Sequence, residues 1–261
     1  MLPLPRLTRL SRTAKSRGYA INFEDTGEGS AVVLLPGYMQ SAADYREAGY
    51  VERLAANRRV LAVDPLGHGH SYKPHDAEPY RSPGVAADVI AVLDAAGVEK
   101  AAVWGYSRGG WLAGMTAIEF PDRLTGLILG GAALTETPPP DIPNWVDALS
   151  RADWTAFWAL FPIPLAPEIQ GHFQDVNDPR ALAAERIGRL ESAYVFDLSR
   201  VSVAALVYCG GDDGPEDAVA TAHAMKTEVQ VIDGCDHFGA FREVDLVVPL
   251  AVAFLESAPA N

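Results

Sequence analysis

One serine in a short glycine-rich turn is the residue best placed in this sequence to act as a nucleophile. The turn Gly105-Tyr106-Ser107-Arg108-Gly109 follows an apolar run and opens a helical segment. A strand–turn–helix of this kind holds the serine in a strained backbone conformation, and the glycines two positions before and after it avoid steric clashes. The helix dipole favours negative charge developing there. We therefore predict that Ser107 is a nucleophile.

A histidine and two aspartates in later loops supply the partners that such a serine needs. A serine hydroxyl is a weak nucleophile until a base takes its proton. His237 follows a strand candidate at 228–232, and Asp212 and Asp213 follow another at 204–209. The acid that orients the histidine is expected between Ser107 and His237 in the chain. Spacing alone leaves both aspartates open.

Short β-rich runs alternate with helical stretches along the chain. Most of the strand candidates are continuous apolar runs, which is typical of strands buried on both faces. Helical spacing lies between them, and the pattern predicts an α/β fold, a mostly parallel sheet flanked by helices. The strand candidates are 19–24, 31–35, 59–63, 101–104, 124–129, 204–209 and 228–232, and the clearest helices are 82–97, 108–119 and 242–258.

Residues 134–200 interrupt the alternation because they contain no convincing strand. A helix is predicted from Asp178-Pro179 to Ser192, and aromatic residues are dense throughout. An insertion this long exceeds an ordinary connection. We predict a helical cap at 134–200 on a core made of 19–133 and 201–261.

Aromatic residues of this insertion are candidates for contact with a substrate. Their helical spacing is explained equally by packing of the cap on the core, and one side chain can do both. The candidates are Trp145, Trp154, Trp158 and Phe161.

Four segments, in order, resemble the α/β-hydrolase fold family, in the cap-bearing branch of esterases, lactonases, epoxide hydrolases and cofactor-free haloperoxidases. Leu34-Leu35-Pro36-Gly37-Tyr38 resembles the oxyanion loop, and residues 64–71 (DPLGHGHS) resemble the D-x-x-G-x-G-x-S segment. The serine turn and the later acid and histidine loops complete the set. The resemblance covers nearly everything after residue 18 and implies an α/β-hydrolase core with an inserted helical cap.

The resemblance also assigns roles to individual residues. The family's G-x-x-D register, counted from Gly210, places the acid at Asp213. The oxyanion hole is implied to use the backbone N–H groups of Tyr38 and Arg108. This chain has Pro36-Gly37 where the family usually has His-Gly, which leaves the anchoring of that loop open. The Arg108 side chain is expected in a structural salt bridge or in solvent, with a substrate carboxylate as the alternative.

Two further points bear on the reaction. The family's epoxide hydrolases and dehalogenases use aspartate as the nucleophile, so serine at position 107 disfavours alkyl-enzyme chemistry. His68 and His70 lie in a loop that is architectural in this family, and neither is expected to be catalytic.

Composition limits the partners and the compartment. The 261 residues carry 21 basic and 34 acidic side chains, a net charge of −13, which argues against nucleic acid or an anionic membrane as a main partner. Residues 1–18 contain only basic charges and are predicted to form a flexible tail. The two cysteines, Cys209 and Cys235, form no metal or disulfide pattern, and with no export signal a cytoplasmic location is expected.

The sequence thus predicts a serine hydrolase that cleaves an ester, lactone or thioester of a small, fairly apolar molecule through an acyl-serine intermediate, without metal or organic cofactor. The alternatives are perhydrolase or haloperoxidase activity, carbon–carbon bond hydrolysis or lyase chemistry with the same triad, and a hydrolase-like receptor for a small ligand. The oligomeric state is not indicated.

Overall fold

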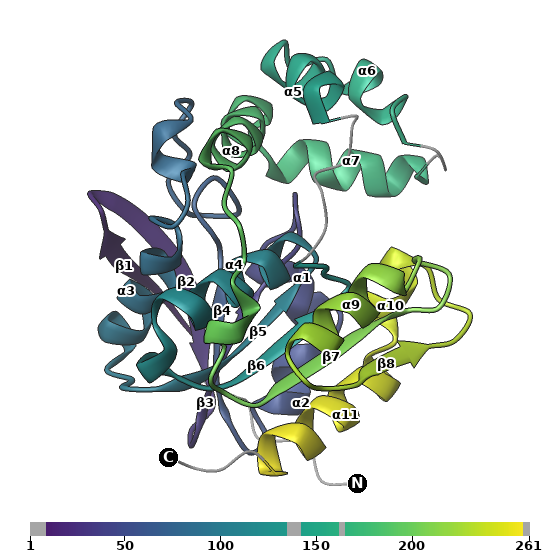
Figure 1. Ribbon diagram of the computed structural model, residues 1–261. Helices are drawn as coiled ribbons and strands as arrows, with labels where there is room; N and C mark the ends of the chain where they lie inside the picture. Colours follow the sequence, from purple (N-terminus) through teal and green to yellow (C-terminus); the bar gives the residue numbers. More distant parts are fainter. Residues whose placement is uncertain (1–8, 135–141, 162–164, 258–261) are drawn as a thin grey trace, which may run out of the picture.

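An eight-stranded, mostly parallel sheet forms the centre of the molecule, as the sequence predicted (Figure 1). The structure is a computed structural model, and it describes residues 9–134, 142–161 and 165–257. The strand order is β1-β2-β4-β3-β5-β6-β7-β8, in which β1 and β2 run antiparallel to their neighbours and the other pairs are parallel. The strands are β1 Arg9–Ser16, β2 Tyr19–Thr26, β3 Ala31–Leu35, β4 Arg59–Val63, β5 Ala101–Tyr106, β6 Leu124–Gly130, β7 Ala205–Gly210 and β8 Val229–Ile232.

Helices cover both faces of the sheet. One apolar core packs α3, α4 and α9 against one face, and a second packs α1, α2, α10 and α11 against the other. Burial on both faces explains the continuous apolar runs of the central strands. The helices are α1 Ala42–Glu47, α2 Tyr50–Leu54, α3 Ala86–Ala96, α4 Arg108–Glu119, α9 Glu216–Ala224, α10 His237–Arg242 and α11 Val244–Ser257.

In the described part of the segment between β6 and β7, four α-helices lie together beyond one end of the sheet (Figure 1). We refer to these helices, α5 to α8, as the cap. Their apolar residues form a separate core around Phe157, Trp158 and Phe173, which also contacts Met39 of the loop after β3. The cap helices are α5 Ile142–Ser150, α6 Trp154–Trp158, α7 Pro167–Val176 and α8 Pro179–Ser192.

The prediction of a flexible basic tail was wrong for Arg9–Ser16, which forms β1. This strand pairs with β2 along its whole length. Arginines of this region pair with acidic side chains: Arg12 lies 2.8 Å from Asp25, and Arg17, just beyond the strand, lies 2.6 Å from Asp88. Paired charges of this kind look the same in a sequence as the charges of a solvated tail. Residues 1–8 lie outside the described part.

Two helix predictions needed correction at their ends. The helix predicted from residue 82 begins at Ala86, because residues 83–85 form tighter turns, in which Ala86 N–H donates to Pro83 O and Ala87 N–H donates to Gly84 O. The helix predicted over 242–258 is divided, since α10 ends at Arg242 and α11 begins at Val244 with Pro249 inside it. None of the described helices has both the length and the hydropathy needed to span a membrane.

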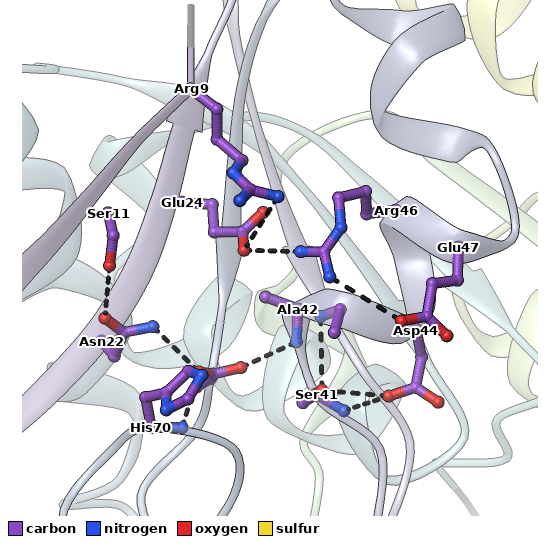
Figure 2. A network of polar contacts seen from close by, with 12 residues as sticks. Arg9, Ser11, Asn22, Glu24, Ser41, Ala42, Asp44, Arg46, Glu47 and His70 are labelled. Carbon is purple, nitrogen blue, oxygen red and sulfur yellow. Dashed lines mark hydrogen bonds and ion pairs between the residues drawn. The ribbon is translucent and has the colours of Figure 1, made fainter.

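The carboxylate of Asp64, just after β4, ties three segments together near the carboxyl ends of the strands. It accepts hydrogen bonds from Asn22 Nδ2 (2.9 Å), from the backbone N–H of Ala42 (2.7 Å) and from the backbone N–H of His70 (2.8 Å). Figure 2 labels these three donor residues. Asp64 is 2% exposed, so these donors replace water around its carboxylate. The D-x-x-G-x-G-x-S segment is therefore structural here, because its aspartate joins β2, β4 and α1.

We expect the substitution Asp64→Asn to lower the free energy of unfolding by about 2–3 kcal/mol, since hydrogen bonds to a buried charge are stronger than neutral ones. Urea denaturation measures the change. Asp76→Asn is the matched control, because Asp76 is exposed and its loss should change stability by less than about 0.5 kcal/mol. Equal midpoints for the two variants would contradict this structural role.

Candidate active site

Ser107 occupies a strained turn between β5 and α4. Its backbone angles are φ 52° and ψ −120°, in the region that residues with a Cβ avoid. The backbone N–H of Ser107 donates to Gly130 O (2.8 Å), and its carbonyl accepts from the N–H of Trp111 (3.1 Å), the first bond of α4. The hydroxyl makes no capping bond to the helix, although serine at this position usually does. The side chain is therefore available for chemistry.

Two glycines allow the turn because the chain passes within contact distance of their α-carbons. A Cβ at Gly105 would lie 2.1 Å from Gly109 O, and a Cβ at Gly109 would lie 2.0 Å from Leu35 O at the end of β3. Real Cβ atoms do not approach backbone oxygens so closely. The glycines two residues before and after the serine are thus required by close approach, as the sequence analysis supposed.

His237 and Asp213 are brought together from two loops at the same end of the sheet. Nδ1 of His237 lies 2.7 Å from Oδ2 of Asp213, whereas the side chain of Asp212 is exposed. The carbonyl of His237 also accepts a hydrogen bond from the hydroxyl of Tyr106 (2.6 Å), which fixes the start of α10. Of the two aspartates that spacing left open, the structure places Asp213 on the histidine, as the family register implied.

Ser107 and His237 line one cavity of about 170 Å³ between the sheet and the cap. Within the described part of the chain, the serine hydroxyl and the imidazole are not hydrogen-bonded to each other. The cavity wall is mostly aromatic, and it includes one cation. The other lining residues are Gly37, Tyr38, Met39, Gln40, Tyr106, Trp145, Phe161, Arg186, Phe238 and Phe241.

The loop after β3 lies directly against the serine. A Cβ added to Gly37 would be 3.6 Å from Cβ of Ser107. The side chain of Gln40 accepts a hydrogen bond from the backbone N–H of Gly37 (3.0 Å), and the N–H of Gln40 returns one to Gly37 O (3.2 Å). Gln40 therefore anchors the loop in which Pro36 replaces the family's histidine. Sequence reasoning had left this anchoring open.

The cap aromatics divide into two groups. Trp145 and Phe161 line the cavity, and their rings stack with centroids 5.3 Å apart. Trp154 and Trp158 stack on each other at 5.7 Å and lie in the cap's own core, away from the cavity wall. The prediction that some of these residues reach a substrate therefore applies to Trp145 and Phe161.

Arg108 forms a buried ion pair with the cap. Its Nε donates to Oε1 of Glu185 in α8 at 2.9 Å, and both side chains are about 3% exposed. Burial tends to raise the pKa of Glu185, but the charges of Arg108 and Arg186 outweigh it and lower the pKa to about 2. This is the salt bridge that the sequence analysis expected for Arg108.

Arg186 is a buried cation that sequence reasoning missed. Its guanidinium lies 3.7 Å from the centre of the Tyr38 ring and 5.5 Å from that of Trp145. Among the described residues its Nε has no hydrogen-bond partner, and Nε1 of Trp145 is unpartnered as well. Among the described residues, Arg108 and Arg186 share the single carboxylate of Glu185, at 2.9 Å and 3.9 Å, so this group of three carries a net positive charge. Helical spacing placed Arg186 in α8 but gave no sign that this residue faces the site.

His68 and His70 have structural positions. His68 is fully buried, and burial together with the charge of Arg108 lowers its pKa to about 3, which keeps the ring neutral. Its Nδ1 contacts Leu66 O at 3.2 Å. His70 contributes its backbone N–H to Asp64. Neither lines the cavity that holds Ser107.

Comparisons with known proteins agree with this arrangement. The model of the α/β-hydrolase fold family matches residues 30–159, about half of the chain. The chain is 33% identical over 129 residues, 49% of its length, to 2-hydroxymuconate semialdehyde hydrolase of Pseudomonas putida. It is 32% identical over 126 residues, 47% of its length, to 2-hydroxy-6-oxo-2,4-heptadienoate hydrolase, also from Pseudomonas putida. The matches span 46% and 45% of these relatives, less than half of each.

Among solved structures, the enol-lactonase from Burkholderia xenovorans LB400 superposes with a TM-score of 0.81 at 21% identity. The superposition covers 94% of this chain and all of that one. Identity this low shows the shared fold and nothing finer.

We expect Asp213→Asn to lower kcat by about 10⁴-fold, because the amide cannot hold the imidazole in the reactive tautomer or stabilise its cation. Steady-state kinetics on an ester measures this. Asp212→Asn is the matched control, one residue away and exposed, and it should stay within about twofold of the wild type in kcat. A larger loss in Asp212→Asn than in Asp213→Asn would reassign the acid.

Proposed function

The chain belongs to the α/β-hydrolase fold family, and we propose that it is a serine hydrolase that cleaves an ester, lactone or thioester of a small molecule through an acyl-serine intermediate. The single observation that carries the proposal is a cavity lined by both Ser107, which lies in a strained turn, and His237, whose Nδ1 lies 2.7 Å from Asp213. Nucleophile, base and orienting acid are the parts that acyl transfer requires.

The reaction follows from these positions. Ser107 Oγ attacks the carbonyl carbon while His237 takes its proton, and Asp213 stabilises the imidazolium that forms. The backbone N–H groups of Tyr38 and Arg108 stabilise the oxyanion, and neither is engaged in a hydrogen bond within the described chain. The imidazolium then protonates the leaving group. Water, activated by His237, hydrolyses the acyl-serine and restores the hydroxyl.

We also propose that the substrate carries a carboxylate on an apolar body. The aromatic wall formed by Tyr106, Trp145, Phe161 and Phe238 suits the apolar part. The unpartnered donors of Arg186 and Trp145 and the unbalanced buried charge suit an anion. Arg186 shares the carboxylate of Glu185 with Arg108, and a substrate carboxylate would give these two buried cations a second anionic partner.

The names of the two relatives support this choice of substrate. Both 2-hydroxymuconate semialdehyde and 2-hydroxy-6-oxo-2,4-heptadienoate are carboxylates. The chain resembles these enzymes over less than half of their length, so the bond cleaved does not carry over with the resemblance. The same triad also serves carbon–carbon bond hydrolysis and perhydrolysis, and product analysis on matched substrates distinguishes them.

Ser107→Ala should abolish turnover of any ester that the wild-type protein hydrolyses, because it removes the hydroxyl that forms the acyl intermediate in the proposed mechanism. Multiple turnover by the wild type, followed as product released per protein molecule, separates an enzyme from a receptor that reacts once. Full turnover in purified Ser107→Ala would falsify the acyl-serine mechanism.

Arg186→Gln tests the carboxylate. With 4-nitrophenyl hydrogen glutarate we expect kcat/KM to fall about 10- to 100-fold, since a hydrogen-bonded charge contributes about 1.5–3 kcal/mol. With neutral 4-nitrophenyl pentanoate, of the same length, we expect a change of less than about threefold.

The matched control is Arg180→Gln, because Arg180 lies in the same helix and is exposed. It should leave both esters unaffected. Equal losses on the charged and the neutral ester in Arg186→Gln would rule out recognition of the carboxylate.

A further inference from the structure

The cap helix α8 contacts both residues whose backbone N–H groups form the proposed oxyanion hole. The hydroxyl of Tyr38 donates to the carbonyl of Leu182 at 2.9 Å, and Nε of Arg108 donates to Oε1 of Glu185 at 2.9 Å. Leu182 and Glu185 are three residues apart, so they lie on one face of α8. The two oxyanion residues come from different parts of the core, the loop after β3 and the start of α4. One cap helix therefore bridges the two sides of the hole.

Adjacent contacts join the same helix to the same loop. The guanidinium of Arg186, one residue beyond Glu185, lies 3.7 Å from the centre of the Tyr38 ring. Nδ2 of Asn177, just before α8, donates to the carbonyl of Met39 at 2.8 Å. Burial raises the pKa of the Tyr38 hydroxyl, which stays protonated and able to donate. The loop after β3 is thus fixed from the cap side as well as by Gln40 from within.

The contacts of Arg108 and Tyr38 with α8 are shielded from water, so no water molecules compete with them. Arg108 and Glu185 are both almost fully buried. A buried ion pair is lost only at a high free-energy cost, because the remaining charge has no water to compensate it. A displacement of α8 away from the core would separate Arg108 from Glu185 and Tyr38 from Leu182 at the same time.

We propose that α8 is a positioning element of the oxyanion hole, in which the Leu182 carbonyl and the Glu185 carboxylate hold Tyr38 and Arg108 so that their backbone N–H groups point into the cavity. This inference rests on the proposed function, because it concerns the oxyanion formed on Ser107. The cap then contributes to the rate of the chemical step as well as to the shape of the cavity. Glu185 is a positioning residue and does not touch the substrate.

The test compares three variants on an ester that the wild type hydrolyses. Tyr38→Phe removes one hydroxyl and keeps the backbone donor. Glu185→Gln removes the charge that holds Arg108. Glu191→Gln is the matched control. Glu191 also lies in α8 and pairs with a residue outside the cap, Arg81, at 2.6 Å, but this ion pair is exposed and neither residue lines the cavity.

We expect Tyr38→Phe and Glu185→Gln each to lower kcat about 10-fold, a fraction of the 10²–10³-fold loss on removing an oxyanion donor. KM should stay within about twofold in both, since the contacts act in the transition state. The affinity for a boronic acid, which bonds to Ser107 and places an anionic oxygen in the hole, should fall in step with kcat. Glu191→Gln should match the wild type in all three measurements.

Several outcomes would overturn the inference. One is an unchanged kcat in Tyr38→Phe, and another is a rise in KM without loss of kcat. A third is the same loss in Glu191→Gln as in the other variants. If Glu185→Gln does not fold, Tyr38→Phe decides alone. If the wild-type protein shows no Ser107-dependent turnover, the proposed function fails, and this inference fails with it.

Discussion

The positive φ angle of Ser107 is the constraint on which the rest of the site depends. A residue with a Cβ holds this conformation only where its surroundings leave no alternative. Here the N–H of Ser107 is bonded to β6, its carbonyl starts α4, and Gly105 and Gly109 let β5, α4 and the end of β3 meet closely. The same close contact carries the loop after β3 alongside the serine. The strained turn and the position of the oxyanion loop are therefore one packing arrangement.

The second organising feature is the balance of charge beneath the cap. Arg108, beside the nucleophile, is neutralised by Glu185 from α8, and Arg186 on the next position of the helix is left facing the cavity. Packing of the cap on the sheet domain thus gives Arg108 an ion-pair partner and also places a second cation, Arg186, at the cavity. Three residues thus connect the attachment of the cap with the two proposals made above, for the oxyanion hole and for an anionic substrate.

The sequence predicted the parts of the fold that follow from local pattern. Strands β3 and β4 have the predicted bounds, because strands buried on both faces appear as uninterrupted apolar runs bounded by turn residues. Ser107, Asp213 and His237 could be predicted to lie at one end of the sheet because each follows such a strand, and the structure places them there. Strand β1 was missed because its basic residues are paired with carboxylates distant in sequence. Tertiary packing of the cap decides which of its side chains face the cavity, and a sequence pattern does not show this. The sequence therefore did not indicate Arg186, and it did not distinguish the cavity-lining Trp145 and Phe161 from the other two aromatic candidates.

The most direct test of the account is intact-protein mass spectrometry after brief exposure to a fluorophosphonate, with peptide mapping of any adduct. An activated serine reacts with this reagent, whereas an ordinary surface serine does not. We predict one adduct, on Ser107, that is absent in Ser107→Ala and forms far more slowly in His237→Ala. No adduct on the wild-type protein, or an adduct that forms equally fast without His237, would contradict the assignment of Ser107 as a nucleophile activated by His237 and Asp213.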